Sequence, residues 1–214
     1  MAVYYKLDDN NTIHYSNTQV DSSWTEKLWS DTDICGEHYV TIDSNPFILE
    51  GDDDARYLFA WCLNKTIDHL DWIDTSNCTR LDSMFASSHI KSADLHTWDV
   101  SKVTRLHNMF EHCNALQSVN LIGWDVSSVE MCAYMFYDCQ DLTEIKVDLG
   151  CNWAEDMVNL DEYDNGTDMF ADCLDLPGYR DYKTNIDYAN SSGGYFHGVW
   201  SWKKHEIWIK EYED

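Results

Sequence analysis

Apolar residues recur through the middle of the chain with a spacing of about 25 residues. A leucine or methionine followed by phenylalanine occurs at five places, and successive places lie 26, 25, 26 and 34 residues apart. A repeat of this length is typical of a solenoid, in which each coil buries its apolar residues against the next coil. The five pairs are Leu58-Phe59, Met84-Phe85, Met109-Phe110, Met135-Phe136 and Met169-Phe170.

The segment 116–139 illustrates the elements that one repeat predicts. Its first part, up to Leu121, is a short strand segment rich in apolar residues. Gly123 and Asp125 then turn the chain, and Asp125 or Ser127 can accept the free N–H groups at the start of a helix. The apolar residues that follow are spaced as on one face of a helix, namely Val129, Cys132, Met135 and Phe136.

Each repeat therefore predicts one short strand and one helix per ~25 residues. The expected fold class is an α/β repeat, a short leucine-rich-repeat solenoid with capping elements at both ends. The expected domains are an N-terminal cap over residues 1–51, the solenoid over 52–176 and a C-terminal cap over 177–214.

The N-terminal segment predicts elements that cover the first coil. Residues 1–17 indicate a hairpin, because the turn residues DDNN separate two strands. Residues 23–26 have the capping-box pattern of a short helix, which would carry Trp24, Leu28 and Trp29. Residues 38–42, HYVTI, indicate a strand, and GDDDARYLFAWC places acids at the positive end of the first repeat helix.

The C-terminal segment indicates a closing hairpin. In GGYFHGVWSWKKHEIWIKEYED, aromatic and polar residues alternate on both sides of KKH. Its tryptophans are interpreted as the core of the C-terminal cap, with an exposed interface tryptophan as the minority alternative. They are Trp200, Trp202 and Trp208.

Six of the eight cysteines occupy apolar positions of the repeat, where a free thiol packs well. Cys113 is one of them, and the neighbouring His112 is replaced by aspartate in sister repeats, so this pair is interpreted as core rather than as a reactive or metal-binding site. Because no CxxC motif occurs, zinc-ribbon and thioredoxin-like sites are not expected. A reduced compartment is favoured, and a disulfide at Cys35 or Cys151 is left open.

The repeat L-x-x-V-x-L-x-x-W-D-V-S-x-V-x-x-x-x-x-M-F-x-x-C resembles that of the BspA-like leucine-rich-repeat family over about residues 52–196. The resemblance implies a solenoid that binds other macromolecules, commonly as part of a bacterial surface protein, and it brings no catalytic residues. Surface members typically have a signal peptide and an anchor. Neither pattern is seen in the chain, and a cytoplasmic location is therefore expected.

The net charge of the chain limits the classes of molecule that it is expected to bind. The chain has 39 acids and 14 bases, a formal net charge of −25. Such a molecule repels nucleic acid and anionic membranes and is attracted to basic surfaces. Direct nucleic-acid binding and membrane binding are therefore not expected, whereas a protein partner with a basic surface is.

The expected contact residues are the acids that flank the repeats. The first group is Asp52, Asp53 and Asp54, and the second is Asp161, Glu162 and Asp164. The second group lies in DEYDNGTD, which faintly resembles a calcium loop but lacks its spacing and its closing glutamate. Hydrolase, zinc-protease, phosphate-loop and dinucleotide motifs are absent from the sequence. We therefore predict no catalytic residue, no metal and no cofactor.

Two classes of function follow from these observations. The first is a non-enzymatic, acidic intracellular inhibitor that occludes the positive groove of a nucleic-acid-processing enzyme, as phage-type anti-restriction or anti-CRISPR proteins do by nucleic-acid mimicry. The second is a surface adhesin or receptor-binding module, which the family resemblance implies. An enzyme is not favoured.

Overall fold

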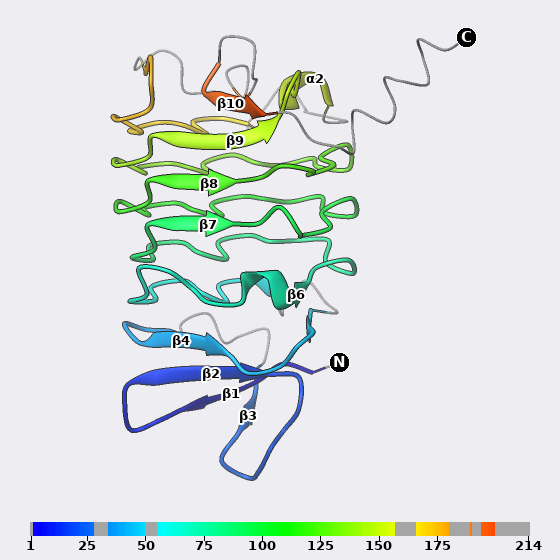
Figure 1. The fold of residues 1–214 in the computed structure, drawn as a ribbon, viewed down its shortest axis with the longest axis vertical. Helices are drawn as coiled ribbons and strands as arrows, with labels where there is room; N and C mark the ends of the chain where they lie inside the picture. The colour runs from blue at the N-terminus through cyan, green and yellow to red at the C-terminus, as the bar shows by residue number, and fades with distance from the viewer. Residues whose placement is uncertain are drawn as a thin grey trace, which may run out of the picture.

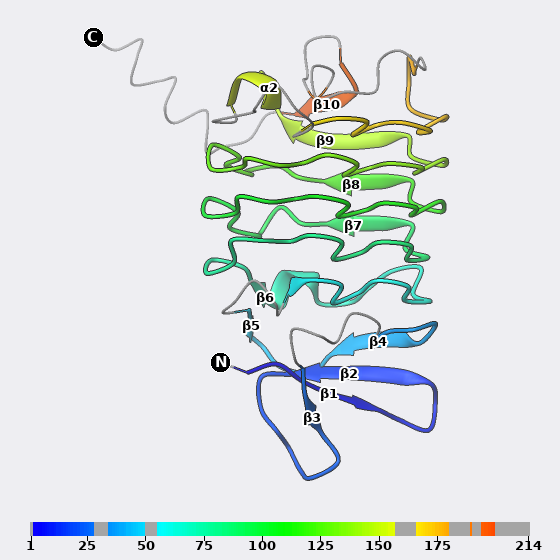
Figure 2. The same cartoon turned by 180° about the vertical axis from the view of Figure 1, so that it is seen from behind.

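The computed structural model describes residues 2–27, 34–49, 55–156, 166–179, 189 and 194–199. Its central part is a β-solenoid of about five turns, with a repeat of ~26 residues. The coils stack along one axis, from an N-terminal sheet at one end to strand β10 at the other (Figures 1 and 2). The predicted solenoid is thus confirmed, whereas the division at residues 51 and 176 stays a prediction.

One side of the solenoid is a parallel sheet with the strand order β10-β9-β8-β7. Each strand pairs in parallel with the strand of the next coil, and the apolar residues Ala93, Val119 and Ile145 lie in one buried column. The strands are β7 (Ser92–Asp94), β8 (Ser118–Asn120), β9 (Glu144–Asp148) and β10 (Phe196–Val199).

The predicted repeat helices are wrong. The segments between the strands form ladders of turns, and the helical elements named within the described residues are the 3-10 helix η1 (Leu70–Trp72) and the short helix α2 (Trp153–Asp156). Alternate N–H groups bond to the next coil, as from Phe110 to the carbonyl of Met135 at 2.8 Å. The N–H groups between them bond three residues back within their own coil, as from Glu111 to Asn108 at 3.1 Å.

The helix prediction failed because turns and helices bury the same positions. Steps of three, one and three residues bring an apolar side chain inward in both structures. In the turns, however, two residues per coil have left-handed φ angles, such as 58° at both Asn108 and His112. A left-handed residue other than glycine costs about 1–2 kcal/mol. The hydrogen bonds to the neighbouring coil offset that cost. A prediction made from one repeat alone does not include these bonds, because their partners lie in another coil.

The core of the solenoid is a stack of phenylalanine rings along its axis. Neighbouring ring centroids lie 5.1 to 5.9 Å apart. The rings are fully buried, and methionine side chains of the same repeat positions lie beside them in the buried cluster. The stacked residues are Phe59, Phe85, Phe110, Phe136 and Phe170.

All eight cysteines are free thiols with buried side chains, as the repeat pattern predicted for six of them. The thiols also supply hydrogen bonds. Cys113, Cys139 and Cys173 each donate to the carbonyl of the phenylalanine one coil earlier, at 2.9 to 3.0 Å. Ser88 occupies the same position in its coil, and a hydroxyl suits it because it is also a donor.

The N-terminal sheet has the order β3-β1-β2-β4, with β1 (Tyr4–Leu7), β2 (Thr12–Ser16), β3 (Thr25–Glu26) and β4 (Tyr39–Ile42). The predicted hairpin is confirmed by the antiparallel pair β1–β2, and the predicted strand HYVTI by β4. The predicted capping box is wrong, because residues 25–26 pair with β1 as a strand. Leu28 and Trp29 lie outside the described residues.

Polar side chains join this sheet to the first coil. Asn64 accepts from the N–H of Val40 at 2.7 Å and donates to its carbonyl at 3.0 Å, as a neighbouring strand would. The hydroxyl of Tyr15 donates to the carbonyl of Leu58 at 2.9 Å. Strands β5 (Phe47–Ile48) and β6 (Ile73–Asp74) form a further parallel pair.

At the other end, β10 pairs in parallel with β9. The predicted closing hairpin is therefore tested only in its first strand, which adds a parallel strand to the solenoid. Trp200, Trp202 and Trp208 lie outside the described residues.

A tryptophan of each middle repeat ties its coil to the coil before it. The indole N–H of Trp124 donates to the carbonyl of Leu95 at 2.9 Å, and that of Trp98 donates to Leu70 at 2.9 Å. We expect Trp124→Phe to lower the free energy of unfolding by about 0.5–1.5 kcal/mol, because the carbonyl of Leu95 loses one of its two donors and keeps the backbone N–H of Trp98. Urea denaturation measures this loss. Trp98→Phe should give a similar loss, and no loss in either variant would contradict the assignment.

Candidate functional site

The six acids expected to bind a partner lie outside the described residues. This applies to Asp52, Asp53 and Asp54 and to Asp161, Glu162 and Asp164. The structure therefore does not place them, and their role stays a prediction. A different set of acids is brought together by the coils.

These acids form a column along one edge of the solenoid. Asp74, Asp99 and Asp125 occupy the same position in three successive coils, just after the strand side. In each, Oδ1 accepts the backbone N–H two residues ahead at 3.0 Å, from Ser76, Ser101 and Ser127 respectively. From the sequence, Asp125 or Ser127 is predicted to cap a helix. The hydrogen bond of Asp125 is observed, but it closes a turn.

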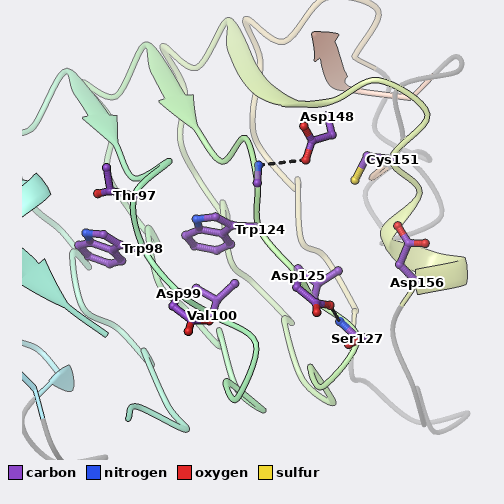
Figure 3. Close-up of a pocket in the computed structure, with 12 residues that line it drawn as sticks. Thr97, Trp98, Asp99, Val100, Trp124, Asp125, Ser127, Asp148, Cys151 and Asp156 are labelled. Atoms are coloured by element: carbon purple, nitrogen blue, oxygen red, sulfur yellow. Dashed lines mark hydrogen bonds between the residues drawn. The ribbon is translucent and has the colours of Figure 1, made fainter. Parts of the chain in front are cut away.

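Beside this edge lies a groove with a volume of about 650 Å³ (Figure 3). Four of its lining residues are aspartates: Asp99, Asp125, Asp148 and Asp156. The described lining residues include no lysine, arginine or histidine. Trp98 and Trp124 lie one coil apart beneath the groove and are almost fully buried. The groove is therefore negative, with an apolar floor.

Asp148 holds the groove in shape. It is the last residue of β9, it is only 5% exposed, and its Oδ2 accepts the N–H of Gly123 at 3.0 Å. Gly123 has φ 85°, a left-handed angle that glycine adopts without strain. Asp156 comes from α2 and is exposed at the opposite side of the groove. The site is thus formed by two successive coils and by the short helix α2, which follows β9.

The described residues assemble no metal centre. Among them, no three histidine, cysteine or acidic side chains are placed to hold a metal ion. Burial raises the pKa of the Cys113 thiol to about 12, which makes this thiol a poor nucleophile at neutral pH. His112 instead pairs with Asp138, its Nδ1 lying 2.8 Å from Oδ2. The calcium-like loop falls mainly outside the described residues.

The described helices are too short to cross a bilayer. This agrees with the sequence, in which no apolar stretch approaches the ~18 residues that a spanning helix needs.

Comparison with known proteins identifies the repeat. Residues 53–177 match the family described as "Mycoplasma protein of unknown function, DUF285". The chain belongs to the DUF285 family. The match covers the residues of the whole turn ladder.

DUF285 membership supports the resemblance to surface-protein leucine-rich repeats in part, because DUF285 is akin to those repeats. No curated protein and no solved structure matches the chain. The DUF285 description states no function, and the case for one rests on the geometry of the chain itself.

The sequence contained part of the signal for this groove. Asp74, Asp99 and Asp125 recur at a fixed distance before the methionine, which marks a turn position. Their alignment on one edge follows only once the coils are known to stack in register. Asp148 and Asp156 follow the last regular unit, and no repeat position predicted them.

Proposed function

We propose that the protein is a non-catalytic binding protein whose acidic edge docks on a basic surface of a protein partner. More specifically, we propose that the partner is a nucleic-acid-processing enzyme and that the solenoid occludes the positive groove of this enzyme. The observation that carries the proposal is the groove lined by four aspartates beside a regular column of acids, on a chain of net charge −25.

The column suits such a partner in the sign and the regular repeat of its charges. Successive coils of a parallel solenoid lie ~4.8 Å apart, so Asp74, Asp99 and Asp125 repeat a negative charge at about that interval. Duplex DNA carries one phosphate per 3.4 Å along each strand. The carboxylates are thus spaced more widely than the phosphates are along the duplex axis, and the likeness to a phosphate row is in sign and regular repetition. The eight reduced thiols favour the cytoplasm, where thiols stay reduced.

The test neutralises the groove without changing its shape. Partners are captured from a bacterial lysate, purified, and their affinities measured at about 0.15 M salt. We expect Asp99→Asn, Asp125→Asn and Asp156→Asn together to weaken binding at least tenfold, because three contacts lose their charge. Asparagine keeps a side-chain oxygen, which can still accept the backbone N–H that each of these aspartates binds. Duplex DNA should compete with the protein for the partner.

The matched control neutralises three exposed acids away from the groove: Asp68, Asp141 and Asp175. This variant has the same net charge and should bind almost as tightly as the wild type. Equal losses in both variants would mean that total charge, not the groove, governs binding. No loss in either would reject the acidic edge as the contact.

The second candidate, a surface adhesin or receptor-binding module, rests on the kinship of DUF285 with surface-protein repeats. It predicts a different result. Its partner is a host-surface protein, its affinity changes little with salt, and duplex DNA does not compete.

A further inference from the structure

The solvent side of the turn ladder differs from the rest of this acidic chain. We call it the turn face; it comprises the outward side chains of residues 55–63, 80–89, 105–114, 131–140 and 166–174. Three of the four arginines of the chain are on its first three coils: Arg56, Arg80 and Arg105. The basic end of this face is independent of the acidic groove.

The arginines are held in place by their neighbours. A parallel backbone bridge places Arg80 and Arg105 in register, and both guanidinium groups approach Oδ2 of the buried Asp82, at 2.6 and 3.2 Å. The guanidinium of Arg56 lies 5.4 Å from the centre of the Tyr57 ring. Fixed arginines lose little side-chain entropy when a carboxylate partner binds them.

The last two coils of the same face are acidic. Asp138, Asp168 and Asp172 surround Tyr137 there. The charge of Asp172 is the main cause that raises the pKa of the Tyr137 hydroxyl, followed by burial and then by the other acids. The turn face therefore has a basic end and an acidic end along the solenoid axis.

Side-chain size also varies along the face. The first coil carries the stacked rings of Tyr57 and Trp61, with centroids 5.9 Å apart. In the second coil, the positions of Tyr57 and Ala60 hold the small residues Ser83 and Ala86. In the fourth coil these two positions hold Tyr134 and Tyr137. Tyrosine, tryptophan and arginine are the residues most enriched at protein interfaces.

Unpaired polar atoms also gather on this face. Within the described residues, seven buried side-chain atoms lack a hydrogen-bond partner, and five of them are on the first three coils of the turn face. Buried polar groups are normally paired, so such a cluster indicates a surface that a partner completes. The atoms are Arg56 Nε, Asp82 Oδ1, His107 Nδ1, Asn108 Oδ1 and Arg105 Nε, the last of which has its ion pair with Asp82 Oδ2 but no hydrogen bond.

We propose that the turn face is a self-association surface, on which a second copy of the chain binds with its solenoid axis antiparallel. A two-fold axis perpendicular to the face, passing between Met109 and Phe110, exchanges the first and fifth coils and reverses the direction within each coil. This operation places Arg56 of one copy opposite Asp172 of the other. A two-fold interface uses the same patch on both copies, as this requires.

The same operation matches large side chains with small ones. Tyr137 of one copy meets Ser83 of the other, and Tyr134 meets Ala86. Asp138 falls opposite Asp82, where Arg80 and Arg105 supply the compensating positive charge. Charge and size are thus complementary in one arrangement, and both follow from the register of the coils.

The net charge of −25 opposes this contact over long distances. At 0.15 M salt the Debye length is about 8 Å, so charges away from the interface are largely screened. The strength of the contact is then determined mainly by the pairs of charges that face each other across it. Five coils at ~4.8 Å give a face only ~20 Å tall, which places the contact among small interfaces. A weak dimer that dissociates on dilution is expected.

The test is a charge swap read by sedimentation or light scattering at about 0.15 M salt, over concentrations from about 10 μM to about 1 mM. The wild type should shift from monomer to dimer over this range. R56E and D172R should each stay monomeric, because each homodimer brings two like-charge pairs together. Their equimolar mixture should dimerise, because every facing pair is then opposite in charge.

Exposed Asp141 lies outside the two-fold contact, and D141R should dimerise as the wild type does. Circular dichroism checks that every variant is folded. If R56E is unstable, D172R still tests the contact, because Asp172 is exposed and its replacement should not affect folding. A wild type that is monomeric at ~1 mM would overturn the proposal. So would dimers of unchanged strength in D172R, or a mixture of folded variants that stays monomeric.

Discussion

Raising the pH from about 7 to about 10.5 is expected to unfold the protein. Burial raises the pKa of four thiols to about 12, those of Cys62, Cys113, Cys132 and Cys173. In the unfolded chain these thiols ionise near pH 8.5. The folded state therefore keeps protons that the unfolded state releases, and stability that is complete below pH ~8.5 is lost as the pH rises towards 12.

The size of the effect follows from the number of thiols. Each loses about 1.4 kcal/mol of stabilisation per pH unit above its unfolded pKa. At about pH 10.5 the four thiols are about 2 units above that unfolded pKa, so together they lose about 11 kcal/mol, comparable to the whole stability of an ordinary domain. Circular dichroism and tryptophan fluorescence against pH measure the transition.

A matched variant separates this effect from general charge repulsion at high pH. In Cys113→Ser the hydroxyl keeps a donor for the carbonyl of Phe85 and does not titrate. Its free energy of unfolding should fall less steeply with pH, by about 1.4 kcal/mol per unit. Equal slopes in the two proteins, or a wild type equally stable at pH 8 and 10.5, would show that the thiols are not buried.

Phe110→Ala is expected to lower the free energy of unfolding by about 3–5 kcal/mol. Phe110 is the middle ring of the stack, 5.1 Å from Phe85 and 5.4 Å from Phe136. Its removal leaves a cavity with the two neighbouring coils on either side. Because the backbone of each coil is fixed by its hydrogen bonds to the next, the cavity cannot close easily.

The control is Leu174→Ala on the outside of the same turn ladder. Leu174 is 57% exposed, and its truncation should change stability by less than about 0.5 kcal/mol. Urea denaturation of both variants gives the comparison. A small loss for Phe110→Ala, or losses of similar size, would contradict the view that the ring stack is the main core.

Much of the fold could be predicted because burial repeats. The methionines, phenylalanines and cysteines of successive units mark one inward position each, and stacking follows from their register. The backbone conformation between these residues could not be predicted, because its hydrogen bonds go to another coil. The spacing of apolar residues within one repeat does not indicate such bonds. Tyr57, Trp61 and Tyr134 even adopt left-handed angles that their residue types disfavour.

The candidate site was harder to predict for a related reason. Asp99 and Asp156 are far apart in the sequence. They line the same groove only because β9 ends beside the coils that precede it. The separation of arginines and acids on the turn face is likewise invisible in the overall charge. In both cases the relevant neighbour is one coil away rather than nearby along the chain.

The alternation of hydrogen bonds in the turn ladder has a consequence for how such a protein can evolve. Every coil offers the next one the same row of donors and acceptors, whatever its outward side chains are. A duplicated unit of about 26 residues would therefore slot between two existing coils without new backbone geometry. Length and surface chemistry can change independently, as long as the two ends remain covered.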